Sequence, residues 1–202
     1  MSYEITLPDW FDKYNKKSKY TKEWWFRVSN FETNLLTETD LEYWLSRCKD
    51  DIDVLIILLL YYTGSRPTEL TLITWDNFSI RGDLIAIKIP TLKRGFGRTV
   101  FIPINKYTEF IVERIKSLDK KQKNNLILQG LKWWNIRDRI YRITENEMCP
   151  YFFRHNRLSQ LAEAGATIYE LKYFKGAKKI DSVEPYITRA GTNIIKLGKM
   201  IK

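Results

Sequence analysis

Residues 150–186 are the stretch around which the rest of this sequence is organised. The stretch consists of PYFFRH at 150–155, LAEAG at 161–165, FKGA at 174–177 and a final Pro185-Tyr186. Gly165 and Gly176 interrupt an otherwise helical pattern, as glycines at helix C-termini commonly do. The stretch therefore predicts short, basic and aromatic-rich helices, and by itself it does not identify an enzyme.

A second stretch, YTGSRPTELTL at residues 62–72, is followed by Trp75-Asp76. Gly64-Ser65 is predicted to end a buried helix over 51–63, and Pro67 is a residue favoured in the first turn of a following helix. Arg66 then lies on the turn between the two helices, from which it can point its guanidinium into a cleft. The alternative is that Arg66 pairs with Glu69, three residues further on.

Together the two stretches resemble the tyrosine recombinase (phage integrase) family. In that family a T-G-x-R-x-x-E-L-x-x-L box carries the first catalytic arginine, and a P-H-x-L-R-H box carries the second. The 23 residues from Arg154 to Ala177 and the 9 from Ala177 to Tyr186 also match the family's steps to its last histidine or tryptophan and to its nucleophile. The resemblance covers roughly residues 36–186.

The resemblance implies a chemistry that needs neither a metal nor another cofactor. Tyr186 would be the nucleophile and would form a 3′-phosphotyrosine link, although a tyrosine near a C-terminus is ordinarily a docking aromatic. Arg66 and Arg154 would clamp the two non-bridging phosphate oxygens, a task that suits planar guanidinium groups. A cation on the hairpin between two strands would be the general acid. Lys93 is the residue that falls there, with Arg94 and Arg98 as alternatives.

Two positions depart from the family's commonest pattern. Tyr151 replaces the first histidine of the second box but can still donate a hydrogen bond to phosphate, and some archaeal plasmid and virus integrases are similar in this respect. Ala177 cannot donate one, and the loss of one transition-state donor costs roughly 10² to 10³ in rate. His155 matches a histidine that usually packs in the family, so it is assigned no catalytic role.

The implied function is site-specific DNA recombination. A second hypothesis is a catalytically weak or inactive DNA-binding relative that regulates or occupies recombination sites. A type IB topoisomerase-like activity would use the same residues, and strand exchange between two sites distinguishes it.

The net charge of +10 is unevenly distributed along the 202 residues. Residues 36–90 hold 5 basic and 9 acidic side chains, whereas residues 91–144 hold 13 basic and 4 acidic ones. Such asymmetry favours a polyanion bound on one side, and nucleic acid most of all. Double-stranded DNA is therefore the expected partner, and the family resemblance implies a homo-oligomer, a tetramer, on that DNA.

Basic side chains outside the catalytic set are expected to contact backbone phosphates, which position DNA without reading its sequence. They are Arg94, Arg98, Lys132, Arg137, Arg139, Arg142, Lys178 and Lys179.

Several classes of function are disfavoured. Two distant cysteines and a single histidine argue against a zinc site and a Ser-His-Asp triad. The apolar run over 54–62 is too short to span a bilayer, and the N-terminus lacks a signal pattern. The expected location is therefore the cytoplasm of a host cell, without membrane contact.

The expected fold is α+β and mainly helical, with a small three-stranded antiparallel sheet at one edge. Strands are predicted over 77–80, 84–90 and 99–103, and a polar connector over 119–125. Helices are predicted over about 38–48, 51–63, 105–117, 132–143, 151–164, 167–175 and 180–188.

Three parts are expected along the chain. Residues 1–35 form a short basic and aromatic arm that either grips DNA or docks on the main domain, and many family members carry a larger domain there. Residues 36–188 form the catalytic domain. The tail at 189–202 either packs on a neighbouring protomer or folds back on its own.

Overall fold

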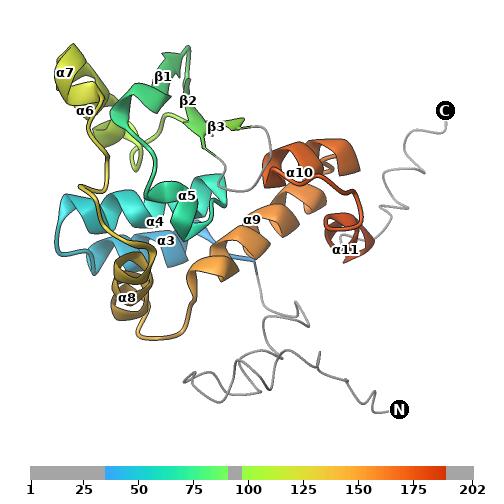
Figure 1. The fold of residues 1–202 in the computed structure, drawn as a ribbon. Helices are drawn as coiled ribbons and strands as arrows, with labels where there is room; N and C mark the ends of the chain where they lie inside the picture. The colour runs from blue at the N-terminus through green and yellow to red at the C-terminus, as the bar shows by residue number, and fades with distance from the viewer. Residues whose placement is uncertain (1–34, 91–96, 190–202) are drawn as a thin grey trace. The chain divides into compact units, whose positions relative to one another are not determined.

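The computed structural model describes residues 35–90 and 97–189 (Figure 1). The N-terminal arm, the tip of the hairpin with Lys93 and Arg94, and the tail lie outside the described residues. The helices are α3 (Glu38–Ser46), α4 (Asp51–Thr63), α5 (Pro67–Leu70), α6 (Glu109–Ser117), α7 (Lys120–Lys123), α8 (Trp133–Ile143), α9 (Pro150–Glu163), α10 (Ile168–Lys175) and α11 (Glu184–Arg189). A 3-10 turn, η1 (Trp75–Asn77), precedes the sheet.

Helix α4 forms the centre of the core. All its residues from 55 to 63 are buried, which is the pattern of a helix covered on every side. Asp50 caps its start by accepting a hydrogen bond from the Asp53 amide at 2.8 Å. Gly64 ends it in the left-handed conformation, with φ of 55°. The predicted limits of 51–63 are therefore confirmed, and Arg66 follows directly on the turn.

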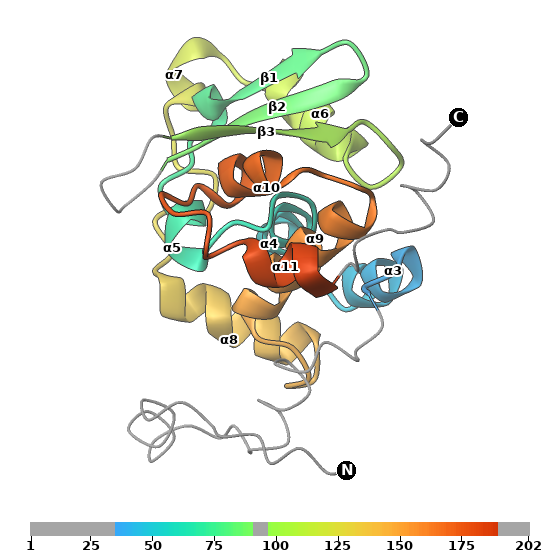
Figure 2. The ribbon, with the colours of Figure 1, turned by 90° about the vertical axis from the view of Figure 1, so that its right-hand side faces the viewer.

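The sheet is an antiparallel meander of β1 (Phe78–Arg81), β2 (Leu84–Ile89) and β3 (Arg98–Pro103) in the order β1-β2-β3. Its central strand β2 buries Ile85, Ile87 and Ile89. Helix α10 lies next to β3 (Figure 2), where the Thr99 amide donates a hydrogen bond to the Tyr173 hydroxyl at 3.2 Å. A small antiparallel sheet at one edge of a helical domain is the predicted arrangement.

Helix α9 connects the core to the last two helices. It packs against α4, α10 and α11. The ring centres of its buried Phe153 and of Trp44 are 5.2 Å apart. Pro150 occupies its first turn, where backbone amides have no acceptor within the helix, so the proline's missing N–H costs no hydrogen bond. The packing places the side chains of 150–156 between segments that are far away in the sequence.

Three elements differ from the prediction. The polar connector over 119–125 contains helix α7, because the Asp119 and Gln122 side chains each accept the other's amide in a capping box. Helix α6 begins at Glu109 and not near Asn105, whose side chain accepts the amides of a preceding turn. Helix α11 begins at Glu184, since residues 181–183 form a turn. In the part of the chain described, no helix has the length and apolarity to cross a membrane.

Candidate functional site

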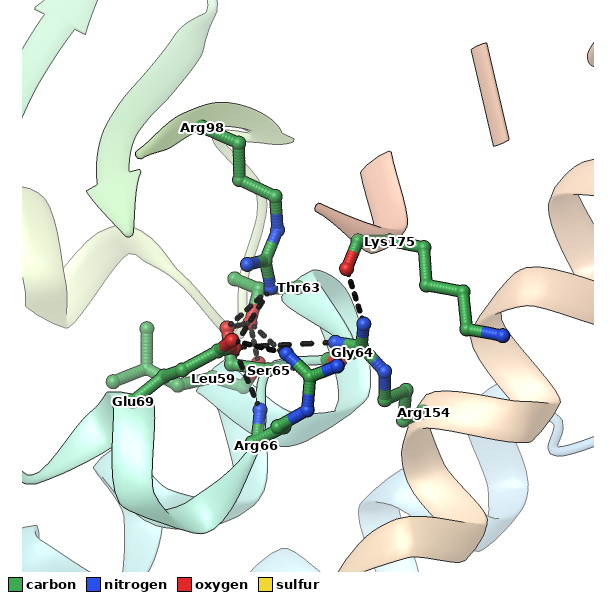
Figure 3. Close-up of polar contacts among 9 residues, drawn as sticks. All are labelled: Leu59, Thr63, Gly64, Ser65, Arg66, Glu69, Arg98, Arg154 and Lys175. Carbon is green, nitrogen blue, oxygen red and sulfur yellow. Dashed lines mark hydrogen bonds and ion pairs between the residues drawn. The ribbon is translucent and has the colours of Figure 1, made fainter. Parts of the chain in front are cut away.

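Three arginines from separate elements meet at one buried carboxylate, that of Glu69 (Figure 3). Arg66 Nη1 lies 2.6 Å from Oε1, and Arg98 Nη2 lies 3.0 Å from Oε2. Arg154 Nη1 is 3.9 Å from Oε2. Arg66 and Arg154 are 88 residues apart in the sequence, so tertiary packing alone brings them together.

The turn before α5 places Arg66 at the edge of this cluster. The Glu69 carboxylate accepts the Arg66 amide at 2.9 Å as well as its guanidinium, so the short helix is capped by the same ion pair. The alternative predicted for Arg66, a pair with Glu69, is thus present. The Arg66 side chain nonetheless stays 32% exposed, so it is partly accessible to a ligand.

The cluster carries more positive than negative charge. Burial alone would raise the pKa of Glu69, but the charge and hydrogen bond of Arg98, with the Arg66 amide and the charge of Arg154, hold that pKa below its usual value. Glu69 is therefore ionised at neutral pH and offsets one of three guanidinium charges. Two positive charges remain in a partly desolvated site, which suits an anion such as a phosphodiester.

Arg154 is held firmly and is only 5% exposed. Its Nη1 donates to the Gly64 carbonyl at 2.9 Å, and its Nη2 donates to the Lys175 carbonyl. These carbonyls lie at the C-terminal ends of α4 and α10, where cations are favoured. Burial, followed by the charges of Arg66 and Arg98, lowers the pKa of Arg154 to about 10, so it remains protonated at neutral pH.

Tyr186 lies on α11, which packs against α9. The residue is 3% exposed, and its Oη lies 2.6 Å from Nδ1 of His155. Lys175 Nζ lies 5.1 Å from the centre of the Tyr186 ring and donates to the Ser182 carbonyl. Burial, then the charges of Arg154 and Arg66, lower the pKa of Lys175 to about 8. The phenol thus lies between an imidazole and an ammonium group.

The sequence profile of the phage integrase family matches residues 34–192. This chain belongs to the phage integrase family. The tyrosine recombinase XerA of Saccharolobus solfataricus is 24% identical over 163 residues, which make up 79% of this chain and 54% of that protein. The chain therefore spans about half the length of that curated relative.

Solved structures share the fold of this phage integrase family member. The XerH recombinase in a pre-cleavage complex with its difH substrate has a TM-score of 0.58 at 15% identity, covering 80% of this chain and 53% of that one. The catalytic domain of bacteriophage HP1 integrase has a TM-score of 0.56 at 21% identity, covering 84% and 96%. The XerA recombinase has a TM-score of 0.57 at 15% identity, covering 95% and 78%. The predicted fold class is confirmed.

Of the other residues predicted for the site, the structure describes Tyr151 and Ala177. Tyr151 is 52% exposed on the first turn of α9, three residues before Arg154. Ala177 follows the end of α10, where its amide donates to the Lys172 carbonyl at 3.0 Å. Lys93 and Arg94 lie outside the described residues. The roles assigned to these residues remain predictions.

Arg98 points inward, whereas the sequence suggested a surface contact with DNA. Its side chain is 1% exposed and is paired with Glu69. A Cβ at Gly176 would lie 3.3 Å from its Nη1, so the end of α10 closes over it. Arg98 can therefore meet a phosphate only if the phosphate reaches the cluster itself.

The basic residues of α8 have acidic partners in this integrase-family domain. Arg139 binds both Asp50 and Asp53, and Arg142 binds Asp53, so the two arginines tie α8 to the start of α4. Arg137 pairs with Asp138 and lies over the ring of Trp133. The exposed lysines of the predicted set are Lys132, Lys178 and Lys179.

Three functional candidates had no role in the site assigned to them from the sequence. Glu69 was considered only as a partner of Arg66, although it lies within the first box and its burial makes it the centre of the cluster. Lys175 had a local signal, since it directly precedes the glycine that ends α10. His155 was matched to a packing histidine of the second box and given no catalytic role, because its contact with Tyr186 spans 31 residues. Among the residues described, no group of histidine, cysteine and carboxylate side chains could hold a metal ion.

Gly64→Ala is expected to destabilise the domain more than Gly82→Ala does. Both glycines have a positive φ, of 55° and 61°, and an alanine there costs about 1 to 2 kcal/mol. At Gly64 the new Cβ would also lie 3.3 Å from Cβ of Arg157, and such overpacking adds about 1 to 3 kcal/mol. No described atom lies within 4 Å of that position at Gly82. Urea unfolding of both variants measures the difference; equal losses would contradict the close approach of α4 and α9.

Proposed function

We propose that this chain carries the catalytic domain of a site-specific DNA recombinase that cuts and rejoins DNA through a 3′-phosphotyrosine intermediate. The observation that carries the proposal is the meeting of Arg66 and Arg154 at Glu69, with Tyr186 on the neighbouring α11. A surplus of guanidinium charge beside a tyrosine is what metal-free phosphoryl transfer needs. DNA in the cytoplasm of a host cell is the proposed substrate, and a tetramer is the proposed assembly.

In the proposed reaction, the Tyr186 oxygen attacks phosphorus while the bond from phosphorus to the 5′ oxygen breaks. Arg66 and Arg154 neutralise the charge on the non-bridging oxygens, and Tyr151 donates a further hydrogen bond. Two of the five N–H donors of Arg154 form hydrogen bonds to backbone carbonyls. These two bonds fix the plane of the guanidinium and so orient its remaining donors for the phosphate. Lys93 gives a proton to the departing 5′ hydroxyl. The reverse attack by a 5′ hydroxyl rejoins the strand.

The proposed domain borders follow from the same assignment. Residues 36–188 would hold the catalytic residues, and the arm over 1–35 and the tail over 189–202 would add contacts to DNA or to another protomer.

One observation favours a second candidate, a non-cleaving DNA-binding relative. Ala177 stands at the position of a histidine or tryptophan donor of the family, and its methyl group cannot stabilise a transition state. Both candidates bind DNA, so binding alone does not separate them.

Covalent capture on DNA tests the proposed activity. The protein is incubated with a pool of random-sequence duplexes, each nicked near its centre. When the protein cleaves close to the nick, the short strand between the cleavage point and the nick diffuses away. A recombinase leaves a protein–DNA adduct that survives denaturing electrophoresis, and sequencing of the captured DNA identifies the site. DNA binding without any adduct under single-turnover conditions would favour the non-cleaving relative.

DNA affinity is expected to fall steeply with salt, because bound cations displace counterions from phosphates. Replacing Lys178 and Lys179 together by alanine should reduce the slope of log affinity against log salt by about 1 to 2, close to one unit for each lost phosphate contact. The control replaces Lys120 and Lys121 on α7, which Figure 1 places on the other side of the domain from α10 and α11. If the two double variants change the slope equally, the connection between α10 and α11 is not a DNA contact.

A further inference from the structure

The contact between His155 and Tyr186 brings a proton acceptor onto the proposed nucleophile. Nδ1 and Oη are 2.6 Å apart, a distance at which a proton passes directly between the two atoms. The rings are 5.8 Å apart between centres. His155 is the chain's single histidine, so its only imidazole lies against this tyrosine.

We propose that His155 is a catalytic residue, the general base that takes the proton of Tyr186 during strand cleavage. This inference rests on the proposed function of Tyr186 and adds a residue to it. His155 then carries its own proton on Nε2, and its unprotonated Nδ1 accepts the hydrogen bond that the phenol donates. Helix α9, fixed by Arg154 and Phe153 in the core, holds Nδ1 in place.

A base is needed because the phenol has a pKa of about 10 in water and is a weak nucleophile while protonated. As Oη bonds to phosphorus, its proton passes to Nδ1, and the bond from phosphorus to the 5′ oxygen breaks. The departing 5′ oxygen takes a proton from a separate acid, proposed above as Lys93. In religation both protons return, so no net proton is gained or lost over a full cycle.

The charges around the pair suit this role. Arg154 adjoins His155 on α9, Lys175 of α10 lies over the Tyr186 ring, and Tyr186 itself comes from α11. A bound phosphodiester brings negative charge into the cluster, and its charge stabilises the imidazolium as it forms. The cation over the ring favours the phenolate in the same step.

The same contact has two competing interpretations. His155 could serve only to orient the phenol, or it could keep Tyr186 in an inactive position until DNA binds. The three roles predict different rates. If His155 keeps Tyr186 inactive, removing His155 accelerates cleavage. If His155 only orients the phenol, any hydrogen-bond acceptor at the same place restores the cleavage rate. If His155 is a base, only a group that can take a proton restores it.

Single-turnover cleavage of the captured nicked duplex separates these roles with three variants. His155→Phe removes the acceptor, and His155→Asn places an amide oxygen, an acceptor that is not a base, near the position of Nδ1. We expect both variants to form the adduct roughly 10² to 10⁴ times more slowly than the wild type. His155→Ala should be equally slow, and added imidazole should restore part of its rate without accelerating the wild type.

Adduct formation by His155→Phe at the wild-type rate or faster would overturn the proposal, and so would full activity of His155→Asn. DNA affinity and thermal unfolding of each variant show whether it is folded. If the phenylalanine variant does not fold, the asparagine variant and the imidazole rescue of the alanine variant decide. Absence of any adduct with the wild type would instead reject the proposed function, and an adduct in Tyr186→Phe would reject the nucleophile.

Discussion

Tyr186→Phe is expected to abolish the covalent protein–DNA adduct while the protein still folds and binds DNA with near wild-type affinity. The variant keeps the buried ring and its contact with Lys175 and removes only the oxygen that would attack phosphorus. It also loses the hydrogen bond to His155, a net cost of about 1 kcal/mol to folding. Denaturing electrophoresis with the nicked duplex measures the adduct, and a filter or anisotropy assay measures affinity.

Tyr169→Phe is the matched control, because Tyr169 is a tyrosine of the adjacent α10 that is 69% exposed. It should form the adduct at the wild-type rate. Digestion of the wild-type adduct followed by mass spectrometry should locate the DNA on Tyr186. An adduct that persists in Tyr186→Phe would place the nucleophile on another tyrosine, and the assignment of α11 would then be wrong.

Glu69→Gln is expected to reduce the free energy of unfolding by about 3 to 5 kcal/mol at neutral pH, the usual effect of removing one partner from a buried ion pair. The amide matches the carboxylate in size but leaves Arg66, Arg98 and Arg154 without a negative charge among them. Arg98, 1% exposed, loses the most because solvent cannot replace its partner. Urea unfolding at neutral pH measures the loss.

The effect of Glu69→Gln should also depend on pH. The folded state lowers the pKa of Glu69 below its unfolded value of about 4.3. The stabilisation is therefore fully present above about pH 4.3 and disappears as the pH falls through the lower pKa of the folded state. The difference between wild type and variant should shrink in that acid range. Glu163→Gln, an exposed carboxylate on α9, serves as the control and should change little at any pH.

Local patterns in the sequence determined most of the secondary structure. The apolar run from Leu55 to Tyr62, with a polar cap before it and Gly64 after it, predicts a covered helix whatever its surroundings. Alternating apolar residues on the central strand, with a Gly82 turn, likewise predict β1 and β2. These patterns act over a few residues, and the propensities that create them do not depend on distant contacts.

In two of the three elements that differ from the prediction, a polar side chain can form hydrogen bonds in either of two local arrangements. Asn105 was expected at the start of a helix, but its side chain accepts the amides of a turn. Asp119 was expected in a connector, but it caps α7. Such polar side chains satisfy either arrangement with similar hydrogen bonds, so short-range pattern does not decide between them.

Some features of the candidate site follow from local sequence, and others follow from packing between distant segments. Local sequence patterns were enough to place Arg66 on a turn three residues before Glu69, and to place Arg154 and Tyr186 on two different helices with a third between them. Two contacts depend on tertiary packing: the pairing of Arg98 with Glu69 and the contact of His155 with Tyr186. The direction of a side chain at the start of a strand follows from register and from what covers the strand, here the end of α10. The contact across 31 residues follows from the packing of α11 on α9, which no local pattern encodes.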